Sequence, residues 1–199
     1  EIGQKKFAYK YKNLEVGAKF NQFVFRLKKY DPDLDFKVVR RIVGADYTIE
    51  ECIEHEACNT MDEIRDFYYK FGEYIAIGYI LCANDLHFEN IIAAGKYPVI
   101  IDIETIIQNI NPIDGEASAL KKVMYSSNET VLGTGLLPTG NLSDPKKTVR
   151  MSALDNGKQT LPFKVLKPTK ELSDEMRYEY QEHQIDGAQN IPILNGEEV

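Results

Sequence analysis

The stretch CANDLHFENIIAAGKYPVIIDIETIIQN, residues 82–109, sets acidic and polar side chains around two short apolar runs. The runs cover residues 91–94 and 99–103, and Gly95 and Pro98 between them are typical of a turn, so the stretch predicts a hairpin. Its charges belong either to the solvent-exposed surface of that hairpin or to ligands and bases gathered around one reaction centre. The acidic and polar side chains are those of Asp85, His87, Glu89, Asn90, Asp102 and Glu104.

A long amphipathic helix is predicted just before this stretch. Thr60 and Glu63 have the spacing of a capping box, in which the two side chains cap the first helical turn. Apolar side chains then recur at helical spacing through residues 64–79. The pattern predicts a helix that ends near Asn84, where the polar stretch begins.

The N-terminal part of the chain is predicted to combine strands with one helix. In residues 5–13, aromatic side chains alternate with alanine and lysine, a period of two that predicts a strand with Lys10 on one face. The spacing of apolar residues predicts a helix over 17–30. Residues 36–43 and 47–54 are strand-like runs around a Gly-Ala-Asp turn, and they predict an antiparallel hairpin.

The last part of the chain gives weaker patterns. TLPFKVLKP at 160–168 is strand-like and carries lysines, whereas ELSDEMRYEYQEHQ at 171–184 is charged and helix-like. We therefore expect a strand followed by a helix in this part of the chain.

Composition and charge narrow the class of protein. The chain has 199 residues, 43% hydrophobic and 28% charged, which is typical of a globular protein with a sizeable core. The net charge of -7 argues against a nucleic-acid partner, because phosphate binding favours a basic surface. The three cysteines form no CxxC pair, so we expect reduced thiols in a cytoplasmic protein and no structural zinc. No apolar run reaches the roughly 18 residues of a membrane span.

The order and spacing of these elements favour phosphoryl transfer. That reaction needs a lysine at the nucleotide phosphates, an acidic group at the attacking hydroxyl and oxygen ligands for magnesium. Asp85 and Asn90 have the spacing of the catalytic aspartate and the metal-binding asparagine of protein kinases, and Asp102 follows after a hairpin, as the second metal-binding aspartate does. With Lys10 on an early strand, these residues predict one centre.

Each residue also has a simpler interpretation. The aspartate and asparagine of the loop could form a helix cap and a turn, Lys10 could be a surface lysine, and His87 could be a hydrogen-bonded structural residue. Asp102 and Glu104 could lie on the solvent face of an edge strand. The joint arrangement, rather than any single residue, favours a site. Glu89 is expected to be a solvent-facing charge.

The chain departs from ordinary protein kinases in several motifs. It has no Gly-rich phosphate loop, no HRD motif and no DFG motif. The predicted helix contains no glutamate between Val16 and Tyr30, so the usual ion pair between the lysine and a helix glutamate is missing. Glu50, Glu51 or Glu54 on the predicted hairpin could pair with the lysine instead, and the sequence does not choose among them.

The central stretch resembles the dehydratase domain of the class II lanthipeptide synthetases, the LanM family. DLHFENIIAAGKYPVIIDIET is similar to the catalytic and metal-binding segment of that family, FAYKYKNL resembles its lysine strand, and VLGTGLLPTG and NIPILNGEEV resemble later segments. The resemblance runs across most of the chain. It implies an α+β, kinase-like fold of two lobes, similar to lipid kinases and present here in part.

The activity implied by this resemblance belongs to lantibiotic biosynthesis. ATP phosphorylates Ser and Thr in a ribosomal precursor peptide, and loss of phosphate then leaves dehydroalanine or dehydrobutyrine. Lys10 is implied to hold the ATP phosphates, and Asp85 is implied to orient or deprotonate the substrate hydroxyl, with His87 beside it. The implied magnesium ligands are Asn90, Asp102 and Glu104, the last as a ligand or as a neighbour of the ligands.

The residues for phosphate elimination match the family less completely. Where the family has an arginine before the xGLLPT stretch, this chain has Gly133, whereas Thr139 at the end of that stretch is retained. Without a replacement, the missing cation costs several kcal/mol of transition-state stabilisation. The possible replacements are Lys121, Lys122, Lys146, Lys147 and Arg150.

The resemblance also implies an organisation and partners. Residues 1–55 are expected to be part of a small lobe, and residues 56–199 to be a large-lobe segment with the catalytic loop. The first residue is not methionine and the last residues are loop-like, so we expect a piece of a longer synthetase that includes a cyclase domain. The alternatives are a small-molecule or lipid-type phosphotransferase and a non-catalytic, peptide-binding module of kinase-like fold.

Overall fold

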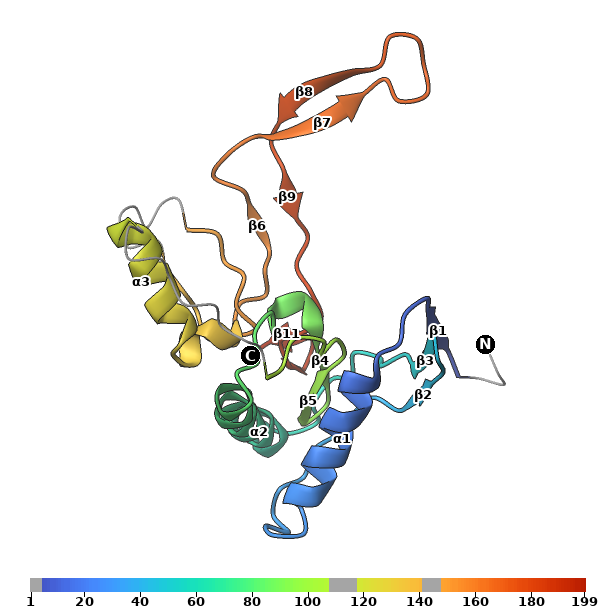
Figure 1. Ribbon diagram of the computed structural model, residues 1–199, viewed down its shortest axis with the longest axis vertical. Coiled ribbons are helices and arrows are strands. Elements are labelled where there is room, and N and C mark those ends of the chain that lie inside the picture. Colours follow the sequence, from blue (N-terminus) through green and yellow to red (C-terminus); the bar gives the residue numbers. More distant parts are fainter. Residues whose placement is uncertain (1–4, 108–117, 141–147) are drawn as a thin grey trace.

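Figure 1 shows the computed structural model, which describes residues 5–107, 118–140 and 148–199. In these ranges helices combine with small antiparallel sheets, so the expected mixture of α and β structure is present, while the kinase-like, two-lobed arrangement stays a prediction. No helix in the described ranges is both long enough and apolar enough to cross a membrane.

The elements are β1 Phe7–Lys10, α1 Glu15–Leu27, β2 Arg41–Val43, β3 Thr48–Glu51, α2 Met61–Ile80, the 3-10 helix η1 Phe88–Asn90, β4 Ile91–Ala94, β5 Tyr97–Ile100, α3 Ala119–Asn128, the 3-10 helix η2 Val131–Thr134, β6 Gln159–Thr160, β7 Val165–Thr169, β8 Arg177–Gln181, β9 Gln184–Ile185, β10 Ile193–Leu194 and β11 Glu197–Glu198.

The N-terminal sheet has the strand order β1-β3-β2 and is antiparallel throughout. This arrangement confirms the predicted strand around Lys10 and the predicted hairpin, although β2 and β3 are shorter than the strand-like runs. The helix predicted over 17–30 is confirmed by α1, which covers Glu15–Leu27. The division of the chain after residue 55 stays a prediction.

The two faces of this sheet have the reverse of the usual polarity. The register sets Arg41 opposite Glu50 and Lys10 opposite Thr48, and these side chains turn toward the rest of the chain, with Thr48 and Glu50 buried. The outer face exposes three large apolar side chains, those of Phe7 (38%), Tyr9 (54%) and Ile42 (66%). A half-buried antiparallel sheet normally turns its apolar face inward. This sheet is therefore organised around polar contacts.

Helix α2 lies at the centre of the hydrophobic core. Its N-cap is the one predicted, because the side chain of Thr60 accepts a hydrogen bond from the amide of Glu63 at 3.2 Å. The buried core residues Phe67, Phe71 and Tyr74 of α2 belong to one cluster with Phe20 and Val24 of α1 and Ile91 of β4. The helix ends at Ile80, earlier than the predicted end near Asn84, and Cys82 already has a left-handed φ of 47°.

The predicted hairpin over residues 91–103 is confirmed by β4 and β5. Gly95 in its two-residue turn has a φ of +60°, a conformation that glycine adopts without steric cost. Strand β5 ends at Ile100, so Asp102 lies just after the strand rather than within it. The amide of Ile101 donates to the carbonyl of Asn90 at 2.9 Å, which keeps the segment of Asp102 beside the end of the polar loop.

The C-terminal part differs most from the predictions. The strand predicted at 160–168 is confirmed by β7, but the helix predicted at 171–184 is wrong, because β8 pairs with β7 in an antiparallel hairpin that projects from the body (Figure 1). Tyr178 and Tyr180 recur with the period of a strand, and tyrosine favours strands. Helix α3 was not predicted.

Candidate functional site

Main-chain contacts hold the polar loop between α2 and β4. Asp85 has a left-handed φ of 63°, which is uncommon for a residue other than glycine. The amide of Leu86 donates to the carbonyl of Thr134 at 2.9 Å, and the side-chain amide of Asn90 donates to the carbonyl of Asp85 at 2.7 Å. The loop backbone is thus fixed while the Asp85 side chain stays exposed.

His87 lies beside Asp85, as the family resemblance implies. Its Nε2 is 3.6 Å from Asp85 Oδ1, and its Nδ1 accepts a hydrogen bond from the amide of Glu89 at 3.3 Å. Because Nδ1 accepts, a neutral His87 ring carries its proton on Nε2, on the side of Asp85. Glu89 is exposed, as predicted.

A pocket of about 150 Å³ brings four of the predicted site residues together; its lining is Asp85, Asn90, Asp102, Glu104 and Thr105. Partial burial raises the pKa of the Asp102 carboxyl, and a hydrogen bond with Glu104 raises it further. The pKa of Glu104 is lowered, first by the hydrogen bond that it accepts from Lys12. A cation bound beside these two neighbouring carboxyl groups would favour the ionised form of both.

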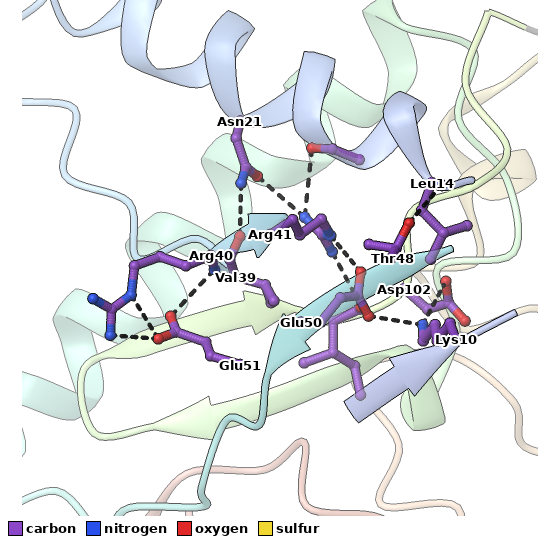
Figure 2. Close-up of polar contacts among 12 residues, drawn as sticks. Lys10, Leu14, Asn21, Val39, Arg40, Arg41, Thr48, Glu50, Glu51 and Asp102 are labelled. Atoms are coloured by element: carbon purple, nitrogen blue, oxygen red, sulfur yellow. Dashed lines mark hydrogen bonds and ion pairs between the residues drawn. The ribbon is translucent and has the colours of Figure 1, made fainter. Parts of the chain in front are cut away.

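Lys10 of β1 lies beside Asp102, one of the residues that line this pocket (Figure 2). Its Nζ lies 2.9 Å from Glu50 Oε2 and 3.6 Å from Asp102 Oδ1. Of the three glutamates that the sequence left open, Glu50 is therefore the partner, while Glu51 pairs with Arg40 and the third glutamate is exposed. The partner of Lys10 is thus a residue of strand β3, whereas in protein kinases the corresponding lysine pairs with a helix glutamate.

Lys12 is a residue of the site that the sequence analysis did not single out. Its Nζ donates a hydrogen bond to Glu104 Oε1. The alternation that places Lys10 on one face of the strand places Lys12 on the same face, and this was the signal available in the sequence. Two lysines from one segment therefore contact the two carboxylates that follow β5.

Asp85 also borders a second pocket, of about 200 Å³, whose other lining residues are His87, Leu132, Gly135, Leu137, Thr139, Met151 and Ser152. Thr139, predicted for elimination, is thereby brought to the same pocket as Asp85 and His87. Gly135 permits this close approach, because a Cβ at this position would lie 3.1 Å from the amide nitrogen of Leu86. The two pockets meet at Asp85.

Gly133 packs against the end of α3. A Cβ at this position would lie 2.3 Å from the carbonyl oxygen of Asn128, a distance that real Cβ atoms essentially never show, so an arginine does not fit here unless α3 moves. Of the cations considered as replacements, Lys121, Lys122 and Arg150 do not line the pocket of Thr139, and Lys146 and Lys147 lie outside the described residues.

The oxygen donors of the smaller pocket suit a hard cation such as Mg²⁺. Asn90 uses its amide nitrogen on the carbonyl of Asp85, so its amide oxygen is the atom left for a cation, beside the carboxylates of Asp102 and Glu104. Within the described parts of the chain, no three His, Cys, Asp or Glu side chains form a group that could hold a metal ion. Protein sites usually hold Mg²⁺ with one or two carboxylates plus substrate phosphates and water, which this donor set fits.

Comparison with known proteins places the chain in a family. Residues 2–199 match the family described as Domain of unknown function (DUF4135), and the chain belongs to that family. It is also 30% identical over 144 residues to the lacticin 481/lactococcin biosynthesis protein LcnDR2 of Lactococcus lactis subsp. lactis. The match covers 67% of this chain and 15% of that relative, so the chain spans a small part of its length. The resemblance to the class II lanthipeptide synthetases is confirmed.

Proposed function

We propose that this chain is part of a lanthipeptide synthetase dehydratase domain, which phosphorylates Ser and Thr in a ribosomal precursor peptide with ATP and then eliminates the phosphate. The observation that carries the proposal is the contact of Lys10 with Glu50 and Asp102, at a pocket also lined by Asp85 and Asn90. A lysine, an exposed aspartate and oxygen ligands are the parts that phosphoryl transfer needs. The similarity to a lacticin 481 biosynthesis protein supports the peptide substrate.

In the phosphorylation step, Asp85 acts at the acceptor hydroxyl. Its exposed carboxylate borders both pockets, so it can orient the hydroxyl of a Ser or Thr side chain and accept its proton. The hydroxyl oxygen bonds to the γ-phosphorus of ATP, the bond to the bridging oxygen breaks, and ADP leaves. Lys10 holds the phosphate oxygens while Glu50 holds Lys10 in position.

Asn90, Asp102 and Glu104 would hold Mg²⁺ in this site. When bound, Mg²⁺ neutralises charge on the phosphate oxygens. Lys12 keeps Glu104 ionised through its hydrogen bond, and the ionised carboxylate is the form that ligates a metal.

In the elimination step, the pocket of Thr139 receives the phosphorylated residue. A base removes the Cα proton, the Cα–H electron pair forms the double bond to Cβ, and phosphate leaves with the electrons of the Cβ–O bond. Thr139 and His87 line this pocket together, so the hydroxyl of Thr139 can donate to the departing phosphate and His87 can move a proton. Because Gly133 supplies no cation, we expect elimination to be slower than phosphorylation.

The proposal includes the setting of the site. Residues 1–55 supply part of the small lobe of a kinase-like fold, and residues 56–199 supply large-lobe elements. The whole protein would then be a cytoplasmic synthetase with a cyclase domain, which acts on the dehydrated peptide.

Mass spectrometry of a precursor peptide incubated with the full-length protein and Mg-ATP tests the proposal. A mass gain of one phosphate group reports phosphorylation, and a net loss of one water reports completed dehydration. We expect phosphopeptide to accumulate, and Asp85→Asn, which keeps the side-chain shape but removes the base, to leave the peptide unmodified.

The other outcomes separate the alternative functions. Phosphorylation of a metabolite or lipid with no peptide product would favour the small-molecule phosphotransferase. Peptide binding without nucleotide binding would favour the non-catalytic module. Dehydration with no phosphopeptide at any time would refute the expected slow elimination at Gly133.

A further inference from the structure

Arg41 of β2 has a buried side chain that contacts three separate parts of the chain. Only 2% of its side-chain surface is accessible to solvent, and its Nε donates to Glu50 Oε1 at 2.5 Å. One terminal nitrogen lies 3.3 Å from Asn21 Oδ1 and 3.4 Å from the carbonyl oxygen of Gly17, both on α1. The other terminal nitrogen donates to the carbonyl oxygen of Ile101 at 3.2 Å.

These contacts divide the Glu50 carboxylate between two cations. Arg41 holds Oε1 and Lys10 holds Oε2, at 2.9 Å (Figure 2). A guanidinium is planar and presents its N–H groups in a fixed fork, so it fixes the orientation of a carboxylate more strictly than an ammonium does. Arg41 balances part of the negative charge of the Glu50 carboxylate. The positive charge of Lys10 is therefore only partly used by Glu50 and can also attract a second anion, such as a phosphate.

The contact with Ile101 links Arg41 to the metal-binding side of the site. Ile101 directly precedes Asp102, whose Oδ1 lies 3.6 Å from Lys10 Nζ. Arg41 therefore connects the sheet that carries Lys10 with the segment that carries Asp102, and also with α1.

We infer that Arg41 is a positioning residue for the nucleotide site: it orients Glu50 toward Lys10 and fixes the main chain next to Asp102. The inference rests on the proposed function. Arg41 is not among the residues that line either pocket at Asp85, and it acts through the positions of Lys10 and Asp102. Without Arg41, Lys10 is the only cation left on Glu50, and the carbonyl oxygen of Ile101 loses its donor. The ammonium group of Lys10, which binds phosphate, is then expected to move toward Glu50 and away from Asp102.

The neighbouring arginine is a matched control. Arg40 pairs with Glu51 at 2.6 Å through the same chemistry, but 69% of its side-chain surface is exposed, and within the described residues none of its side-chain contacts reaches the site. Replacing either arginine with methionine removes the same charge from the same short segment. Only Arg41→Met changes the partners of Glu50 and Ile101.

Calorimetry with Mg²⁺ and a non-hydrolysable ATP analogue tests the inference on the full-length protein. Arg41→Met is expected to weaken binding roughly 10- to 100-fold, the range seen when groups that orient metal-ligating residues are lost. Arg41→Lys should restore binding in part, and Arg40→Met should bind as the wild type does. Equal affinity of wild type and a folded Arg41→Met protein would overturn the inference.

A double variant separates positioning from stability. Arg41→Met leaves Glu50 buried without its arginine and can unfold the protein, whereas Arg41→Met combined with Glu50→Leu removes both buried charges and restores stability. We expect this double variant to unfold near the wild-type midpoint and still bind the analogue weakly, because it lacks both Glu50, which holds Lys10, and the arginine that orients Glu50. Wild-type binding by the double variant would refute a positioning role. Absence of binding by the wild-type protein itself would instead refute the proposed function.

Discussion

The two faces of the β1-β3-β2 sheet carry opposite kinds of side chain, and the polar face is the inner one. Lys10, Arg41 and Glu50 lie on the inner face and contact one another or Asp102, while aromatic and aliphatic side chains of the same strands are exposed. A sheet built only for stability would turn these faces the other way. We infer that charge pairing toward Asp102, rather than apolar burial, decides the orientation of this sheet.

Single substitutions on the inner face are expected to lower the free energy of unfolding the most. A buried charge without its partner costs far more than a solvated one, because the protein cannot replace the lost hydration. On the outer face, Phe7, Tyr9 and Ile42 are exposed, so water already solvates their surroundings. The contrast between the faces is therefore measurable one residue at a time.

Glu50→Ala is expected to have the largest effect. It leaves the guanidinium of Arg41 buried without a carboxylate, which costs about 3–5 kcal/mol of unfolding free energy. Urea unfolding measures this loss. Glu51→Ala removes the same side chain one residue later, where its partner Arg40 is exposed, and should cost clearly less. Equal losses for the two variants would show that burial of the inner face does not raise the cost of losing a carboxylate partner.

Thr48→Val tests an uncharged group of the inner face. The Thr48 hydroxyl donates to the carbonyl of Lys12 at 3.0 Å and accepts from the amide of Leu14 at 2.9 Å. Valine has nearly the same shape but leaves both partners unsatisfied, at a cost of about 1–3 kcal/mol in urea unfolding. Thr48→Ser keeps the hydroxyl and is the control, so an equal loss in this variant would assign the effect to packing.

Ile42→Thr on the outer face is expected to have the smallest effect. Ile42 is largely exposed, and threonine is also β-branched and suits a strand, so the change in unfolding free energy should stay within about 0.5 kcal/mol. A loss as large as that of Thr48→Val would show that the outer face is packed against another surface, and the contrast between the faces would disappear.

The central part of the fold was predictable because its signals are local. The cap at Thr60, the apolar period of α2 and the turn at Gly95 each lie within a few residues of the element that they define. The helix predicted at 171–184 failed for the converse reason, since its charged residues belong to a strand whose pairing with β7 is not visible in composition.

The candidate site was predictable only in part. The loop and hairpin order put Asp85, Asn90 and Asp102 near one another, and the structure places them around one pocket. Glu50 is the partner of Lys10 because of the register between β1 and β3. That register joins residues far apart in the chain, and no short motif encodes it. The buried position of Arg41 was not predicted, because charged residues in a strand-like run are normally expected to be solvent-exposed.

The most direct test of the central claim is calorimetry of the full-length protein with a non-hydrolysable ATP analogue, with and without Mg²⁺, for wild type and Asp102→Asn. The wild type is expected to bind the analogue in the presence of Mg²⁺. Asp102→Asn, folded but without this carboxylate, is expected to give no heat of binding at concentrations that saturate the wild type. Binding that is the same in Asp102→Asn, or the same without Mg²⁺, would contradict the claim that Lys10 and Asp102 form one magnesium-nucleotide site.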